Sequence, residues 1–296
     1  MGENHMTKPQ GQLVTVKDRN MHIRKMGTGS RTIVLLPGHN LPLPSVEFAP
    51  LMRDLSQKHT VCAVELFGYG HSSPIDTVRT NENTVQEIRE GLAQAGLKPP
   101  YVLMPYSASG IYAEYYAAKY PEEIEALILL DASPSVEAVA REWDYSSKDI
   151  FDAVKELEEY VPPTKKEIAE AVEFALEGYL EHGYTEEELI EIYSTQNDKR
   201  TILAQDLSAA DNMREVMGMR IPDEIPILVF YSDMTQFDEQ SQRTWERRVK
   251  EHMYRLGERV KTVTIEGSTH GDIICKPDSR EVIWREVGMF LDGVAR

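Results

Sequence analysis

The sequence predicts an α/β protein with a mostly parallel sheet, helices on both faces of that sheet, and one all-helical insertion. Two observations predict this fold class. Short apolar runs alternate with longer stretches of helical spacing, as expected when strands are buried on both faces between crossover helices. Residues 135–221 break this rhythm, because glutamate-rich helical patterns replace the strand-like runs there.

The N-terminal part predicts a hairpin followed by the first buried strand. Residues 12–18 and 21–26 alternate between apolar and polar side chains, and a turn is predicted at Arg19-Asn20 between them. Residues 32–36 form a continuous apolar run. That run ends in Pro37-Gly38-His39-Asn40, a cluster of residues that break regular structure.

A second helix and strand pair follows with the same pattern. Residues 46–56 have helical spacing, and residues 61–66 form another buried strand. The loop Phe67-Gly68-Tyr69-Gly70-His71-Ser72 comes next. Thr80-Asn81 can then open a helix that runs to about residue 95.

An abrupt change from strand to helix is the centre of the pattern. Residues 101–104 are apolar, residues 106–110 are mostly small or polar, and residues 111–120 predict a buried helix that ends at Pro121. Such a turn would project the hydroxyl of Ser107 above the sheet edge. The alternative is a serine that only caps the helix.

The surroundings of this serine depart from the Gly-x-Ser-x-Gly pattern of a nucleophile elbow. Pro105 and Ser109 stand at the two glycine positions, and Gly110 comes one place later. Ser109 is still small, and the fixed φ of Pro105 suits a strand end. The turn is therefore still expected, with an altered local geometry.

The next strand leads into the helical insertion. Residues 126–130 predict a buried strand that ends at Asp131-Ala132-Ser133-Pro134. Four or five helices are expected after it. Their breaks are expected at Pro162-Pro163, Gly183-Tyr184 and Asn197-Asp198. The insertion also contains recurring aromatic residues, which either pack within the insertion or cover a pocket: Trp143, Phe151, Tyr160, Phe174 and Tyr179.

After Pro222 the α/β alternation returns. Residues 226–231 and 260–265 predict strands, and residues 238–256 and 277–291 predict helices. We therefore divide the chain into a core of residues 1–134 and 222–296 and a helical insertion of residues 135–221.

Composition narrows the class of protein. A net charge of −17 argues against a nucleic-acid or anionic-membrane surface. No apolar run has the length of a membrane span, and the N-terminus lacks the apolar core of a signal peptide. Cys62 and Cys275 are expected to be reduced. We expect a cytoplasmic protein that acts on a small molecule. The sequence does not predict its oligomeric state.

The order of these motifs resembles the α/β-hydrolase superfamily, in its branch of serine hydrolases with a helical cap. The resemblance rests on the Pro37-Gly38 strand end, the Phe67–Ser72 loop, the Ser107 turn, the Asp131–Pro134 strand end, and His270 before the last helix. It implies an eight-stranded sheet with residues 135–221 as the cap.

The resemblance also implies a catalytic Ser–His–acid triad. Ser107 matches the nucleophile, and His270 matches the histidine that takes and returns its proton. Asp131 is the favoured acid and Asp233 the alternative, because residue 235, where many relatives carry the acid, is a threonine. Asp131 could instead cap its own loop. Asp272 is not favoured, because it is too close in sequence to His270.

Backbone N–H groups of His39 and Ala108 match the family's oxyanion hole. No cofactor-binding motif or metal-ligand spacing is present. Gly70-His71-Ser72 is interpreted as a structural loop and Cys62 as a packing residue. The implied function is a serine hydrolase acting on a small, mostly neutral ester, thioester, lactone or amide. The alternative is a ligand-binding protein on the same fold, with weak or lost turnover.

Overall fold

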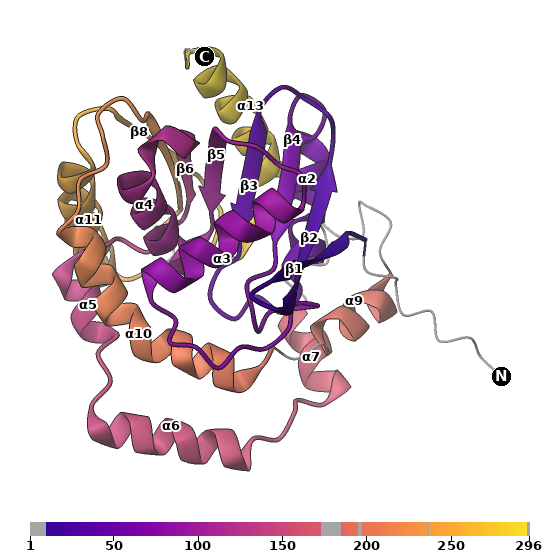
Figure 1. The fold of residues 1–296 in the computed structure, drawn as a ribbon. Helices are drawn as coiled ribbons and strands as arrows, with labels where there is room; N and C mark the ends of the chain where they lie inside the picture. Colours follow the sequence, from indigo (N-terminus) through magenta and orange to yellow (C-terminus); the bar gives the residue numbers. More distant parts are fainter. Residues whose placement is uncertain (1–9, 173–184, 195–196, 236, 295–296) are drawn as a thin grey trace.

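The computed structural model describes residues 10–172, 185–194, 197–235 and 237–294. Eight strands form one sheet in the order β1-β2-β4-β3-β5-β6-β7-β8 (Figure 1). The pairs β1–β2 and β2–β4 are antiparallel, and the five other neighbouring pairs are parallel. The predicted fold class is therefore confirmed. The strands are β1 (Gln12–Val16), β2 (Arg19–Met26), β3 (Thr32–Leu36), β4 (Thr60–Val64), β5 (Tyr101–Pro105), β6 (Ile124–Leu130), β7 (Ile227–Ser232) and β8 (Val260–Ile265).

Helices of the core cover both faces of the sheet. One face packs against α3 (Asn81–Gln94), α4 (Gly110–Lys119) and α11 (Glu239–Leu256). The other packs against α2 (Ala49–Leu55), α12 (Asp272–Cys275) and α13 (Pro277–Asp292). Alternate residues of each central strand point to opposite faces, so Leu103 joins the first cluster and Val102 the second.

The hairpin turn lies two residues earlier than the sequence predicted. Val16 pairs with Arg19, so the two-residue loop is Lys17-Asp18, and Arg19-Asn20 already belong to β2. Lys17 and Asp18 have φ values of 48° and 60°. These values suit a tight hairpin turn whose twist matches that of the strands. The sequence prediction failed because a Lys-Asp pair is a weak turn signal.

The expected helix over residues 46–56 is two short helices. They are α1 (Pro44–Glu47) and α2, with Phe48 between them. The helix expected from Thr80-Asn81 is α3, and the Thr80 side chain accepts a hydrogen bond from the Asn83 N–H at its start.

The elements described between β6 and β7 are all helices. They lie toward the end of the sheet opposite to the C-terminal end of α13 (Figure 1). Asp198 caps the last of them, at the predicted Asn197-Asp198 break. The Gly183-Tyr184 break and the aromatic residues Phe174 and Tyr179 lie outside the described residues. The described helices are α5 (Glu137–Glu142), α6 (Ser147–Glu159), α7 (Lys165–Val172), α9 (Glu186–Tyr193) and α10 (Lys199–Met217).

Within the described ranges, no helix combines the length and the apolarity needed to cross a membrane.

Candidate active site

Ser107 lies at the turn between β5 and α4 with a φ of 55°, a backbone conformation that a serine rarely adopts. Such strain persists only where the surrounding structure imposes it, and it is typical of functional sites. The turn continues as a short 3₁₀ helix, η1 (Ser107–Ser109), before α4 begins. The serine is therefore presented at the carboxyl end of a fully buried strand.

The departures from the elbow pattern have a structural explanation. Ser109 is completely buried, and its hydroxyl donates a hydrogen bond to the Pro37 carbonyl. The close approach to a neighbouring segment occurs instead at Gly110, where a Cβ atom would lie 2.8 Å from the Cβ of Ala132, just after β6. Here the glycine is needed one residue later than in the usual pattern.

Three residues distant in sequence meet at the carboxyl ends of the strands. His270 Nε2 lies 3.0 Å from Ser107 Oγ, and His270 Nδ1 lies 2.6 Å from Asp131 Oδ2. An ionised carboxylate only accepts hydrogen bonds, so Nδ1 carries the proton and Nε2 is left to accept the hydroxyl of Ser107. This arrangement allows His270 to act as a general base toward Ser107.

Asp131 is held in place by β7 and is 3% exposed. It accepts hydrogen bonds from the Ser232 N–H at 2.9 Å and the Ser232 hydroxyl at 2.7 Å. Its own φ is 43°, another strained value next to the site. Asp131 therefore faces His270, and Ser232 is a supporting residue that the sequence analysis missed.

The other two carboxylates are engaged elsewhere. Asp233 accepts the N–H groups of Gly267 and Thr235, and these bonds lower its pKa. Asp272 accepts the N–H of Thr269 and pairs with Lys276 at 3.1 Å. Asp233 thus joins the loops that follow β7 and β8, while the imidazole of His270 contacts Asp131.

Tyr106 is a second residue that the sequence analysis missed. Its ring stacks on the His270 ring, with centroids 4.8 Å apart and planes 21° from parallel. Its hydroxyl donates a hydrogen bond to the His270 carbonyl at 2.8 Å. Burial, together with the charge of Asp131, raises the pKa of Tyr106, so the hydroxyl stays protonated as a donor. Tyr106 thereby fixes both the ring and the backbone of His270.

The loop after β3 lies directly against the nucleophile. A Cβ atom at Gly38 would come within 2.8 Å of the Tyr106 ring and 3.1 Å of the Ser107 Cβ. Ala108 is the second residue of η1, so its N–H lies at a helix N-terminus, where the helix itself offers no acceptor. The predicted oxyanion-hole residues, His39 and Ala108, both border the cavity beside Ser107.

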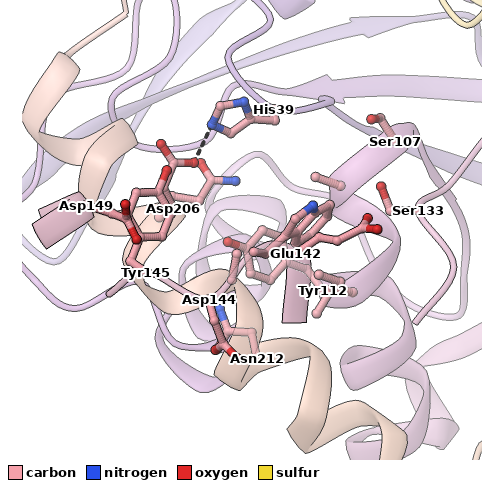
Figure 2. A pocket seen from close by; sticks show the side chains of 15 residues that line it. His39, Ser107, Tyr112, Ser133, Glu142, Asp144, Tyr145, Asp149, Asp206 and Asn212 are labelled. Atoms are coloured by element: carbon pink, nitrogen blue, oxygen red, sulfur yellow. Dashed lines mark ion pairs between the residues drawn. The ribbon is translucent and has the colours of Figure 1, made fainter. Parts of the chain in front are cut away.

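That cavity has a volume of about 630 Å³ and extends from Ser107 to the helical insertion. Figure 2 shows Ser107 on one side and Asp206, Asp149 and Tyr145 gathered on the other. The predicted cap residue Trp143 lines the cavity, whereas Phe151 is 70% exposed. The carboxylates among the lining residues are Glu142, Asp144, Asp149 and Asp206, and no lysine or arginine is among the lining residues in the described part of the chain.

A separate polar cluster contains His71, which the sequence analysis interpreted as structural. His22 Nδ1 and His71 Nδ1 each lie 3.3 Å from an oxygen of Glu65. Among the described residues, these three form a group whose ligand atoms, all within 4.8 Å of one another, could hold a metal ion. His22 lies on β2, whereas Glu65 and His71 both lie in the segment after β4, so the pairing of β2 with β4 brings the three together.

The bonds of Glu65 indicate what this cluster does without a metal. Its carboxylate accepts the backbone N–H groups of Ser45 at 3.2 Å and His71 at 2.6 Å. Burial raises its pKa, but hydrogen bonds from His22 and His71 outweigh burial and lower it to about 2. Both oxygens are thus already used to anchor the loop after β4 to α1, which is a structural role.

Comparison with known proteins agrees with this fold. A family model described as "alpha/beta hydrolase fold" matches residues 31–160. The uncharacterized protein YbdG of Bacillus subtilis is 36% identical over 129 residues, which are 44% of this chain and 40% of that protein. The human serine hydrolase BPHL is 29% identical over 169 residues, covering 56% of this chain and 54% of that protein. The chain thus spans about half the length of the curated relatives it matches.

Solved structures match over nearly the whole chain at low sequence identity. An esterase from Exiguobacterium antarcticum superposes with a TM-score of 0.68 at 15% identity, covering 96% of this chain and all of the other. An enol-lactonase from Burkholderia xenovorans gives 0.64 at 17% identity, covering 95% of this chain and all of the other. The partial family match, the similar solved structures and the eight-stranded topology together show that the chain has the α/β-hydrolase fold.

Proposed function

We propose that the chain is a serine hydrolase that acts on a small, mostly neutral ester, thioester, lactone or amide through an acyl-enzyme intermediate. One observation carries the proposal: the imidazole of His270 lies between the hydroxyl of Ser107 and the carboxylate of Asp131. A serine hydroxyl is a weak nucleophile at neutral pH and needs an adjacent base that a third group orients.

In the proposed reaction, Ser107 Oγ attacks the carbonyl carbon while its proton passes to His270 Nε2. Asp131 accepts the Nδ1–H bond and stabilises the imidazolium that forms. The tetrahedral intermediate then collapses, the bond to the leaving group breaks, and His270 returns the proton to that group. Water, deprotonated by His270, releases the acyl group from Ser107 in the second half of the cycle.

The developing oxyanion requires donors that are already in place. The N–H of Ala108, at the start of η1, and the N–H of His39 are proposed for this role, because fixed backbone donors need no reorganisation during the reaction. Removing one such donor in other enzymes costs about 10²–10³ in turnover.

The cavity supports the neutral substrate class. Its lining contains four carboxylates but, among the described residues, no lysine or arginine, and this charge disfavours an anionic acyl group. Two of the four have arginine partners: Glu142 pairs with Arg248, and Asp144 pairs with Arg214. The similar proteins include a human serine hydrolase, an esterase and an enol-lactonase, which is consistent with ester or lactone substrates.

Labelling with a fluorophosphonate probe tests the proposal. Wild-type protein is expected to label on a single serine, and Ser107→Ala is expected to abolish both labelling and hydrolysis of p-nitrophenyl esters. His270→Ala should label far more slowly, because the base is removed while the hydroxyl remains. Ser133→Ala, which changes another serine of the same cavity, is the matched control for loss of a hydroxyl.

A folded wild-type protein that neither labels nor hydrolyses any ester in a series of increasing acyl length would contradict the proposal. That result would favour the alternative of a ligand-binding protein on this fold.

A further inference from the structure

The loop that carries the proposed oxyanion donor is bound on two sides. On the side of the core, the Ser109 hydroxyl donates to the Pro37 carbonyl, and Gly38 abuts Tyr106 and Ser107. On the opposite side, the contacts come from residues of the helical insertion. The direction of the His39 N–H is therefore set by core and insertion together.

The first contact from the insertion is an ion pair with His39 itself. Asp206 Oδ1, on α10, lies 2.6 Å from His39 Nε2, as the dashed line in Figure 2 marks. The side chains of His39 and Asp206 are 43% and 24% exposed. Partial burial of the carboxylate reduces the solvent screening that makes exposed ion pairs weak. The contact fixes the side chain of the residue whose backbone N–H the proposed reaction uses.

The second contact from the insertion holds the next two residues of the loop. The Asn197 amide group donates to Asn40 Oδ1 at 3.2 Å and to the Leu41 carbonyl at 3.1 Å, and Asn197 is 5% exposed. Asn40 has a φ of 54°, a conformation that costs energy outside glycine and that these bonds help to maintain.

The third contact runs through a buried tyrosine. The Asn40 N–H donates to the hydroxyl of Tyr69 at 3.2 Å, and that hydroxyl donates to Gln205 Oε1 at 2.6 Å. Gln205 precedes Asp206 on α10, so one turn of this helix contacts the loop both directly and through Tyr69. Three separate contacts from Asn197 and the N-terminal half of α10 thus converge on three loop residues, His39, Asn40 and Leu41.

We propose that Asp206 is a positioning residue: through its ion pair with His39, α10 of the helical insertion holds the oxyanion donor in register with Ser107. The inference rests on the proposed function and extends it, because it makes the insertion part of the catalytic geometry as well as the wall of the cavity. Asp206 acts through His39 and is not required to touch the substrate.

Loss of the Asp206 carboxylate should make the position of the His39 N–H less fixed without removing this donor. We therefore expect Asp206→Ala to lower kcat about 10- to 100-fold, below the 10²–10³ that a fully deleted donor costs. KM should change less than about threefold, because an oxyanion donor acts mainly in the transition state. Asp206→Asn keeps an acceptor for the histidine N–H and should lose less than the alanine variant.

The double-mutant cycle with His39→Ala separates this role from a general structural one. The two alanine substitutions remove the same interaction, so the double variant should lose no more kcat than either single variant. Asp211→Ala is the matched control: it removes a carboxylate from the same helix, at an exposed position, and should stay within about twofold of wild type.

Hydrogen–deuterium exchange gives a readout that does not depend on activity. Peptides covering residues 37–41 should exchange several-fold faster in Asp206→Ala than in wild type or Asp211→Ala, while peptides of β5 stay unchanged. Unchanged exchange in that loop, or an unchanged kcat in an active enzyme, would overturn the proposal. Faster loop exchange in a protein that hydrolyses no ester would contradict the hydrolase function but leave the positioning role of Asp206 standing.

Discussion

Among the described elements, strand β5 and helix α6 lie at opposite extremes of burial. Every residue of β5 is buried, whereas no residue of α6 is. The strand is covered by apolar side chains on both sheet faces, so its position is fixed by packing. Helix α6 has a capping box formed by Ser146 and Asp149, and its large apolar residues Phe151 and Val154 are exposed.

The difference assigns separate tasks to the two regions. The sheet holds Ser107 and Asp131 at strand ends with strained φ values, which only a tightly packed surrounding maintains. Asn197 and α10 of the insertion make polar contacts to the loops around the cavity. The triad side chains are therefore expected to depend on the sheet, whereas substrate access and selection and, through Asp206, the position of the proposed oxyanion donor are expected to depend on the insertion.

The largest effect should come from the acid that orients His270. Asp131→Asn is expected to lower kcat by roughly 10³–10⁴, because an amide no longer favours the Nδ1–H tautomer or the imidazolium. Asp233→Asn should change kcat less than about threefold. Steady-state hydrolysis of a p-nitrophenyl ester measures both. Equal losses in the two variants would contradict the assignment of Asp131.

The second-largest difference between β5 and α6 is expected in the free energy of unfolding. Leu103→Ala, in fully buried β5, should lower the free energy of unfolding by about 2–5 kcal/mol. Phe151→Ser on α6 should change it by no more than about 0.5 kcal/mol. Urea unfolding followed by circular dichroism tests the pair. A comparable loss in both variants would mean that α6 contributes to the same packed core.

The stability of the core should vary with pH in the acidic range, because the core contains a buried ion cluster. Glu114 on α4 contacts His252 at 2.8 Å and also Arg255, and the Ser135 hydroxyl donates to it. Burial raises its pKa, but the charges of His252 and Arg255 outweigh burial and lower it to about 2, from an ordinary 4.5.

A lowered folded-state pKa means that this contribution is complete above about pH 4.5 and is lost as pH falls toward 2. Glu114→Gln should therefore be less stable at neutral pH, and its stability should change less between pH 4.5 and 2. Thermal melts of the wild type and variant across that range measure the difference. Parallel pH curves would contradict the role of Glu114.

The smallest effect should come from the charge of the acyl group. A p-nitrophenyl hemisuccinate should have a kcat/KM roughly 3- to 10-fold below that of the butyrate ester at low salt, and the gap should narrow as salt is added. Preference for the anionic ester would show that the acidic lining of the cavity does not select substrates by long-range repulsion.

Much of the site could be predicted because its residues stand at strand ends. Ser107 and Asp131 follow apolar runs, His270 follows the last predicted strand, and the carboxyl ends of parallel strands meet at one edge of a sheet. Tyr106 and Ser232 support His270 and Asp131, and no pattern in the sequence indicates these supporting roles. Their roles depend on stacking and on cross-strand register, which no spacing along the chain encodes.

The sequence by itself determined the alternation of strands and helices, the position of the insertion, and the residues at the strand ends, because local periodicity and chain order carry that information. The tertiary structure alone decided which carboxylate faces His270 and that Asp206 reaches His39. Both depend on how segments more than a hundred residues apart pack against each other, since a carboxylate acts only on what lies within bonding distance.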